Sequence, residues 1–216
     1  MVVLTDLWPL FGLRIETPRL TLRLPTDDDL AQLATLAAGG VHQPGWVPFG
    51  VDWTSGGSPR VEQDFLRYHW RVRGEVEPDD WRLELAVLVG GTPIGCQGIS
   101  GRDFGLLRAV TTGSWLGRRH HGKGYGTEMR AAVLELAFGH LGAVEARSSA
   151  RADNGPSLGV SSKLGYRPNG TSRERRGQEA VTEQHVRLDR RGWEEARPDL
   201  AIEVRGLEPC RPLLGA

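Results

Sequence analysis

Residues 109–141 read AVTTGSWLGRRHHGKGYGTEMRAAVLELAFGHL, and this stretch decides the fold. A strand is expected to end near Leu116, glycines then cluster as far as Gly126, and an alanine-rich helix runs to about Leu141. A turn that leads directly into a helix aims several backbone N–H groups at the positive end of the helix dipole. The stretch therefore predicts a phosphate-binding turn made of His121, Gly122, Lys123, Gly124, Tyr125, Gly126 and Thr127.

Two common nucleotide-binding turns do not account for these glycines. Residues 117–124 nearly match a P-loop, but Gly124 stands where Ser or Thr would coordinate magnesium. The spacing Gly-x-Gly-x-Gly also differs from the dinucleotide fingerprint, and no repeating βαβ pattern surrounds it. Glycines still suit a pyrophosphate, because side chains would block its approach to the backbone, and Thr127 adds a hydroxyl donor.

The chain before this stretch predicts strands with helices between them. Residues 19–24 alternate strictly, so Leu20, Leu22 and Leu24 all line one face of a half-buried strand. Thr26 and three following aspartates predict a helix start, and a second helix is expected over about 60–73. Strands at 82–89 and 94–100 should form a hairpin around Gly90 and Gly91. The irregular loop at 41–59 either lines a pocket or is anchored to the core, the commoner use of its aromatic residues Trp46, Phe49 and Trp53.

The chain after this stretch predicts more strands and one helix. A strand is expected at 144–149, a helix with Pro156 in its first turn and Gly165 after its end, strands at about 166–175 and 181–188, and a short strand at 201–205. The expected class is α/β (α+β), with a mixed, mostly antiparallel central sheet flanked by helices. We expect a single domain over 1–216, with its core at about 14–193 and a C-terminal extension at 194–216.

Composition restricts the ligands. The 27 Lys and Arg residues balance 27 Asp and Glu residues, so no overall field favours nucleic acid or a membrane, and a charged ligand must be bound locally. Cys96 and Cys210 support neither a disulfide framework nor a metal site, and the adjacent His120 and His121 lack a third ligand. The chain shows no signal or membrane-spanning stretch, so a cytoplasmic protein is expected. A homodimer is compatible with the sequence but is not specified by it.

Three motifs, in the right order, resemble the GNAT superfamily (GCN5-related N-acetyltransferases). Trp115-Leu116 followed by Gly122-Lys123-Gly124-Tyr125-Gly126-Thr127-Glu128 is similar to the acyl-CoA signature of that superfamily. Thr17-Pro18-Arg19-Leu20 resembles the opening strand of the branch that includes the ribosomal-protein (Rim-type) N-terminal acetyltransferases. Asp153-Asn154-x-x-Ser157, with Lys163-Leu164-Gly165-Tyr166, resembles the second cofactor-side motif of this branch. The C-terminal tail is similar to that of actinobacterial members linked to succinyl-CoA.

The resemblance implies a splayed sheet and an acyl-CoA site. The pantetheine arm should bond the backbone of Ser114, Trp115 and Leu116, the pyrophosphate should lie on the turn at 121–127, and Asn154 should contribute from the second motif. His121 is a departure, because the family usually has Gln or Arg there, although Arg119 satisfies the pattern if the frame is moved. Backbone amides supply most of the donors in either frame, so CoA binding is expected to survive the change.

The implied reaction is direct attack of an amine on acetyl-CoA or succinyl-CoA, without a covalent enzyme intermediate. Many relatives have a tyrosine seven residues after the asparagine, but here that position is Ser161. Ser157 is therefore the candidate acid, although it equally fits an ordinary serine at a helix start. Thr111 and Thr112 stand where many relatives have a glutamate. Glu174 is the candidate base among carboxylates that also fit solvated strand residues, the others being Glu84, Glu179 and Glu183.

The acceptor is expected to be a primary amine of a small molecule or of a peptide N-terminus. The arginines at 173, 175 and 176 fit a solvated run, and one of them also fits a partner for the carboxylate of succinyl-CoA. A non-catalytic acyl-CoA sensor or partner-binding module is the alternative function, motivated by the missing tyrosine and glutamate. A P-loop phosphotransferase would require magnesium-dependent ATP binding, which this turn does not favour.

Overall fold

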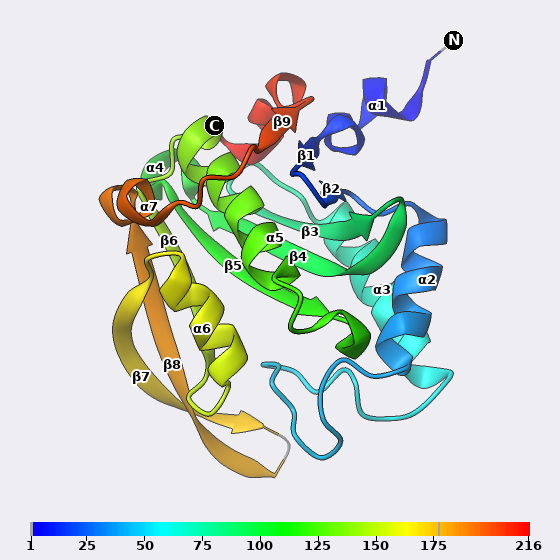
Figure 1. Ribbon diagram of the computed structural model, residues 1–216. Helices are drawn as coiled ribbons and strands as arrows, with labels where there is room; N and C mark the ends of the chain where they lie inside the picture. Colours follow the sequence, from blue (N-terminus) through cyan, green and yellow to red (C-terminus); the bar gives the residue numbers. More distant parts are fainter. Residues whose placement is uncertain (1, 177) are drawn as a thin grey trace.

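A nine-stranded sheet organises the computed structural model, which describes residues 2–176 and 178–216. The strand order is β7-β8-β6-β5-β4-β3-β2-β1-β9, and helices cover both faces (Figure 1). Neighbouring strands are antiparallel except for β5 and β6, which are parallel. The strands are β1 (Arg14–Glu16), β2 (Thr21–Arg23), β3 (Asp80–Val89), β4 (Thr92–Arg102), β5 (Ala109–Leu116), β6 (Glu145–Arg151), β7 (Arg167–Arg176), β8 (Glu179–Asp189) and β9 (Glu203–Arg205).

Helices α2 and α6 begin or end at the capping residues predicted from the sequence. Thr26 accepts a hydrogen bond from the Asp29 N–H, and Asp29 accepts one from the Thr26 N–H, so a complete capping box begins α2. Gly165, with φ of +85°, follows α6 as expected for a left-handed position after a helix. The α-helices are α1 (Leu4–Leu7), α2 (Asp27–Ala38), α3 (Arg60–Gly74), α4 (Phe104–Leu107), α5 (Tyr125–Leu134), α6 (Gly155–Lys163) and α7 (Arg190–Ala196). Short 3-10 turns are η1 (Pro9–Gly12), η2 (Arg118–His120) and η4 (Glu208–Leu214), and η3 (Glu135–Leu141) extends α5 as a π-helix.

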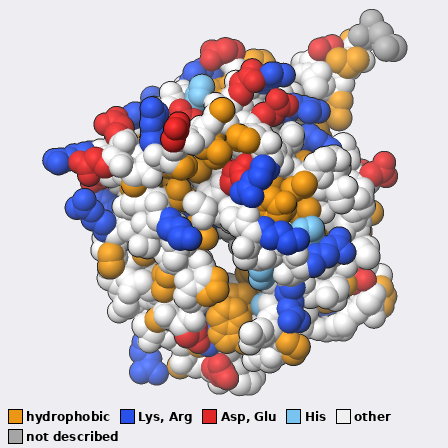
Figure 2. All heavy atoms as spheres, viewed as in Figure 1, with side chains coloured by type: hydrophobic (Ala, Val, Ile, Leu, Met, Phe, Trp, Pro, Cys, Tyr) orange, Lys and Arg blue, Asp and Glu red, His pale blue; other side chains and the backbone are white. Residues whose placement is uncertain are grey.

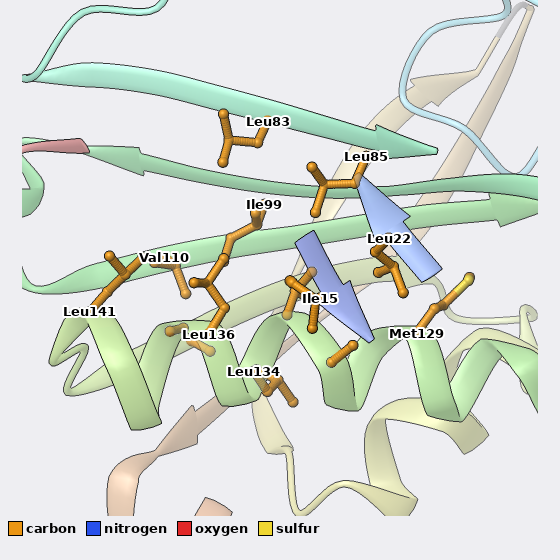
Figure 3. Packing of buried hydrophobic residues seen from close by; sticks show 14 of the residues in the cluster. Ile15, Leu22, Leu83, Leu85, Ile99, Val110, Met129, Leu134, Leu136 and Leu141 are labelled. Carbon is orange, nitrogen blue, oxygen red and sulfur yellow. The ribbon is translucent and has the colours of Figure 1, made fainter. Parts of the chain in front are cut away.

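The larger hydrophobic core lies between the sheet and α5 (Figure 3). Alternate residues of β3, such as Leu83 and Leu85, point toward the helix and share one apolar cluster with Leu134 and Leu136 of the helix and its extension. Because α5 is fully backed by this layer, its N-terminus is held in a fixed position beside the end of β5. The core therefore fixes the turn at 121–127 against the sheet.

The opposite face of the sheet carries α2, α3 and a second apolar cluster. Ala86 and Leu88 of β3 lie in this cluster with Phe65 of α3. The loop at 41–59 is anchored here, because the Trp53 ring lies 5.9 Å from the Phe65 ring and 5.7 Å from the Trp115 ring. Core anchoring, the commoner use considered for these aromatics, is confirmed for Trp53.

The described residues show where the cysteines lie and which metal-ligating groups and long apolar helices are present. Among them, Cys96 and Cys210 are buried free thiols. No group of three or more His, Cys, Asp or Glu side chains in residues 2–176 and 178–216 is arranged to hold a metal ion. The same ranges contain no helix with the length and apolar character needed to cross a bilayer.

Candidate active site where two strands diverge

The parallel strands β5 and β6 separate after a short paired stretch. Within the described residues they pair only from Ala109 to Thr111 on β5, although β5 continues to Leu116 and β6 to Arg151. Figure 1 shows the two strands diverging, with α6 alongside the space between them. The splay implied by the family resemblance is therefore present, and we call the space beyond Thr111 the gap.

Beyond Thr111, the edge of β5 at the gap pairs with no strand in the described part of the chain. The Thr112 carbonyl accepts a hydrogen bond of 2.9 Å from Ser148 Oγ of β6, which places the Thr112 peptide groups on the gap side. Because backbone groups alternate along a strand, the peptide groups of Ser114 and Leu116 share this edge. Two of the three residues expected to bond the pantetheine arm thus present their backbone to the gap. Trp115 points its side chain to the opposite face, against Trp53 and Phe65.

The glycine-rich turn joins the end of β5 to α5. Gly122 and Gly124 have φ angles of +73° and +82°, a region that favours glycine. The backbone N–H groups of residues 122–126 donate to no carbonyl or side chain in the described part of the chain. Five consecutive donors therefore surround the helix start, as anion binding requires.

A buried carboxylate fixes this turn to the N-terminal strands. Glu128 is 5% exposed, and it accepts hydrogen bonds from Thr17 Oγ1 at 2.6 Å and from Arg19 Nε at 2.6 Å. Arg19 also lies over the Tyr125 ring and donates to the Lys123 carbonyl. Glu128 has the favourable position at a helix start expected from the sequence, and it also locks the β1–β2 connection to the turn.

His121 has a structural partner that explains its presence. Its Nε2 lies 2.9 Å from the Leu116 carbonyl oxygen, so Nε2 carries the proton and donates. This bond ties the turn to the end of β5 at the edge of the gap. The imidazole thus holds the turn against the end of β5, and the backbone N–H groups of the turn remain available to bind an anion.

Basic side chains collect beside the turn without acidic partners. Arg118, Arg119 and Lys123 are exposed, and within the described residues none of them forms an ion pair. The pKa of His120 is lowered by partial burial and by the charges of Arg119 and Lys123. Figure 2 shows the surface hollowed between α6 and the segment leading into α5, with Lys and Arg side chains at the rim. Although the net charge of the chain is zero, these side chains form a local cationic patch.

Helix α6 places the second motif on the other side of the gap. Asn154 caps the helix, its side-chain oxygen accepting from the Ser157 N–H at 3.2 Å. The Ser157 hydroxyl makes no hydrogen bond in the described part of the chain. Ser161 is buried and donates to the Ser157 carbonyl at 3.3 Å. Ser157 thus has a free hydroxyl, whereas Ser161 is engaged within its helix.

A buried polar cluster lies at the start of the gap on the α5 face. Arg130 of α5 donates to Ser148 Oγ of β6 at 3.3 Å and to Ser114 Oγ of β5 at 3.2 Å. The Tyr166 hydroxyl lies 3.1 Å from Thr112 Oγ1. Burial raises the pKa of Tyr166, and the Arg130 charge opposes this increase. The guanidinium therefore bridges the two strands where they separate.

A second ionisable pair lies on the α3 face. Glu84 of β3 accepts a hydrogen bond of 2.7 Å from the Tyr68 hydroxyl. Burial raises the pKa of Glu84, while the Tyr68 hydrogen bond and the Arg82 charge lower it. The Glu84 carboxylate lies over Gly98 of β4, where an added Cβ would be 3.0 Å from Oε2. The expectation of a solvated strand residue is wrong for Glu84, because α3 covers it.

Glycines leave the sheet open between Glu84 and the gap. Gly98 pairs with Glu84 on one side and with Gly113 of β5 on the other. A Cβ added at Gly113 would meet nothing within 4 Å. Open space therefore lies above Gly113 of β5, next to the Gly98 position that the Glu84 carboxylate covers.

Glu174, the base expected from the sequence, lies on β7 at the other end of this face. Its carboxylate accepts a hydrogen bond from Ser172 Oγ at 2.7 Å, and the same Ser172 Oγ lies 2.9 Å from His185 Nε2. The strand β7 does not border the gap, because β8 lies between β7 and β6. The structure places the turn, Ser114, Leu116 and Ser157 around the gap and Glu174 on a strand that does not border it.

Arg130 was missed as a site candidate and Glu84 was not preferred among the four carboxylates considered for the base, although the sequence contains signals for both residues. Arg130 lies three residues before Val133 and seven before Ala137, so the helical period places it on the apolar face. Glu84 interrupts an almost continuous apolar run from Leu83 to Val89, which indicates a strand covered on both faces. A charged residue inside either pattern is a candidate for a buried functional group.

This arrangement of a splayed sheet, a glycine-rich helix start and a bordering gap defines an acyl-CoA-binding class of fold. The family model of the acetyltransferase (GNAT) domain matches residues 19–167. The chain belongs to this acetyltransferase family, whose members transfer acetyl groups from acyl-CoA. The match contains the whole turn, Arg130, Asn154 and Ser157.

Solved structures share the fold at low sequence identity. RimJ of Mycobacterium smegmatis, in complex with CoA-disulfide, aligns with a TM-score of 0.70 and 20% identity, over 84% of this chain and 88% of that one. A GCN5-related N-acetyltransferase of Brucella melitensis aligns with a TM-score of 0.66 and 16% identity, over 85% and 81%. RimL, a ribosomal L7/L12 alpha-N-protein acetyltransferase, gives 0.61 and 12%, over 81% and 94%.

Proposed function

We propose that this protein transfers an acetyl group from acetyl-CoA to a primary amine of a small molecule or a peptide N-terminus, by direct attack. The observation that carries the proposal is the gap between β5 and β6, which opens beside five unpaired backbone donors at the start of α5. A CoA ester can place its pyrophosphate on the donors and its thioester in the gap. Exposed Arg118, Arg119 and Lys123 suit the remaining negative charge of CoA.

The donor is held by backbone on one side and by α6 on the other. In this proposal Ser114 and Leu116 bond the pantetheine arm, Trp115 contributes only backbone, and the turn 121–127 holds the pyrophosphate. The Asn154 amide N–H₂ group is left for the donor because only its oxygen caps α6. The Ser157 hydroxyl, which is free, remains the candidate that protonates the leaving sulfur or holds a water.

The amine must lose a proton, and the geometry favours Glu84 over Glu174 for this step. The Glu84 carboxylate covers Gly98, and in this proposal it takes the proton through a water molecule in the open space above the neighbouring Gly113. Its raised pKa keeps it a stronger base than an ordinary carboxylate. Glu174 stays a sequence-based hypothesis, and Glu174→Gln tests it.

Succinyl-CoA is the alternative donor. Among the three arginines considered for its carboxylate, Arg176 forms an ion pair with Glu183, so its charge already has a partner. Arg173 is exposed on β7 and is the better variant to examine. Turnover of acetyl-CoA and succinyl-CoA should be compared in Arg173→Ala, Arg175→Ala and Arg176→Ala. An unchanged donor preference in all three variants would refute a role for these arginines in binding succinyl-CoA.

A matched pair of glycine variants tests the phosphate-binding turn. Gly122 and Gly142 lie before and after the same helical segment, with φ angles of +73° and +78° and open space around both. Alanine at either position costs roughly 1–2 kcal/mol of strain. Only Gly122→Ala should also weaken CoA binding, measured by calorimetry, because its Cβ lies among the N–H donors. Equal CoA affinity in both variants would refute the site.

The sensor alternative is motivated by Ser161, which stands where many relatives have a tyrosine, and by Thr111 and Thr112, which stand where many have a glutamate. It predicts CoA binding without thiol release from either CoA ester across a panel of peptides, polyamines, amino sugars and small amines. The enzyme predicts amine-dependent thiol release with at least one member of that panel. The same glycine variants serve as controls, since only Gly122→Ala should lower the rate.

A further inference from the structure

Arg130 is a charged side chain enclosed by the fold. It is 3% exposed, and its hydrogen bonds go to neutral hydroxyls, those of Ser114 and Ser148 and also that of Tyr166. Its Nε is buried and has no hydrogen-bond partner in the described part of the chain. No ion pair among those residues includes Arg130, whereas the equally buried Glu128, two residues before it, is paired with Arg19.

An unpaired buried guanidinium is costly, and its position indicates what could compensate it. An arginine cannot shed its proton at physiological pH, so it stays charged where water is excluded. One hydroxyl separates it from solvent, because Ser114 is exposed on the edge of β5. Arg130 therefore faces the gap from the α5 side, at the point where the paired stretch of β5 and β6 ends.

We propose that Arg130 stabilises the negative charge on the sulfur of CoA, both in the departing thiolate and in bound free CoA. The inference rests on the proposed function, because it assumes that the thioester lies in the gap. The Ser114 and Ser148 hydroxyls hold the guanidinium between the strands, and the Tyr166 hydroxyl lies against both Arg130 and Thr112. Arg130 thus takes on the task that a tyrosine of α6 performs in many relatives.

The step conserves atoms and charge. The amine nitrogen uses its lone pair to form a bond to the thioester carbon, and the carbon–sulfur bond breaks with its electron pair on sulfur. The proton leaves the nitrogen toward Glu84 on the α3 face. The products are an amide, a protonated carboxyl group and a thiolate that faces the cation of Arg130.

The pH dependence of CoA binding tests this role without an acceptor. Calorimetry would compare CoA with desulfo-CoA, which lacks the sulfur, from about pH 6 to 9. A thiol ordinarily titrates at roughly pH 8.5 or above, and each unit by which binding lowers its pKa strengthens thiolate binding about tenfold. The affinity ratio of CoA to desulfo-CoA should therefore rise about tenfold or more with pH in the unaltered protein.

Variants assign that rise to Arg130. Arg130→Gln should make the ratio independent of pH, and Arg130→Lys should restore most of the rise. Arg190→Gln is a matched control, because Arg190 donates to the carbonyls of Phe138, at the end of the same helical segment, and of Ala143, just after it, and should keep the rise. A merely structural arginine would change both affinities together and leave their ratio unaltered.

Several outcomes would overturn the inference. A flat ratio in the unaltered protein does so even if Arg130→Gln fails to fold. A full rise in Arg130→Gln does so as well, because another group would then supply the effect. Failure of both ligands to bind would overturn the proposed function and this inference with it, whereas a flat ratio leaves CoA binding intact.

Discussion

Removal of one hydroxyl should shift the acid limb of the rate profile. Tyr68→Phe deletes the donor to Glu84 and keeps the ring that contacts His69 and Arg71. In the proposed reaction the neutral amine gives its proton to ionised Glu84. The kcat/KM value should therefore fall at low pH as Glu84 becomes protonated, and the midpoint of that fall reports the pKa of Glu84.

The size of the shift follows from the hydrogen bond. A bond of 2.7 Å to an ionised carboxylate contributes about 1.5–3 kcal/mol, and 1.36 kcal/mol corresponds to roughly one pKa unit. Because the bond stabilises the charged form, its loss raises the pKa of Glu84 by about one to two units. The acid limb should move upward by that amount, while the plateau at high pH is retained.

The assay is amine-dependent thiol release from acetyl-CoA, followed across pH with an amine that the protein accepts. Glu84→Gln should lose about 10²–10⁴-fold in kcat/KM at every pH, since no base remains at that position. Arg71→Met is the control, because Arg71 stacks on the Tyr68 ring at 5.8 Å. An acid limb that stays in place in Tyr68→Phe, or moves downward, would refute the assignment of Glu84.

Three further predictions concern stability and the turn. Glu128→Gln should lower the free energy of unfolding by about 2–3 kcal/mol, because the charge-assisted bonds between residue 128 and Arg19 weaken and the helix start loses a negative charge. The melting temperature should therefore fall by roughly 4–10 °C, and an unchanged melting temperature would contradict this prediction. Burial lowers the pKa of His69 to about 4, so the unfolded chain takes up the proton first and stability should decrease by about 3 kcal/mol as pH falls from 6.5 to 4. Urea titrations should show this loss, and His69→Gln should abolish it; a loss of equal size in the variant would exclude His69. His121→Gln can still donate to the Leu116 carbonyl and should leave CoA affinity within about threefold, whereas a tenfold loss in calorimetry would show that the imidazole itself is needed.

Local signals in the sequence predicted most of the fold. Thr26 begins α2 with the expected cap, Gly90 and Gly91 form the turn of the β3–β4 hairpin, and Gly165 follows α6. Each of these features depends on residues only a few positions apart, so propensity and turn chemistry suffice. The π-helical end of α5 carried no such signal, because its apolar spacing also fits an ordinary helix.

The site was predictable where it consists of backbone and much less where it consists of paired side chains. The turn at 121–127 could be located because glycines and a helix start create donors irrespective of distant contacts. The pairs Arg130 with Ser114 and Glu84 with Tyr68 join different elements, and the second pair depends on α3 covering β3. Sequence spacing alone could not distinguish Glu84 from Glu174, because both lie on strands with suitable polarity.

Buried Arg130 and half-buried Glu84 lie on opposite faces of the sheet, so the proposed proton and electron-pair movements run in opposite directions. Arg130 reaches the gap from the α5 face and Glu84 approaches it across Gly98 from the α3 face. With β4 and β5 between them they cannot form an ion pair, so each keeps its charge available for a group in the gap. An amine entering above Gly113 would lose its proton toward α3, while the electron pair of the broken bond moves toward α5. A carboxylate and a guanidinium placed in this way can replace the glutamate and tyrosine that this chain lacks at the positions used by many relatives.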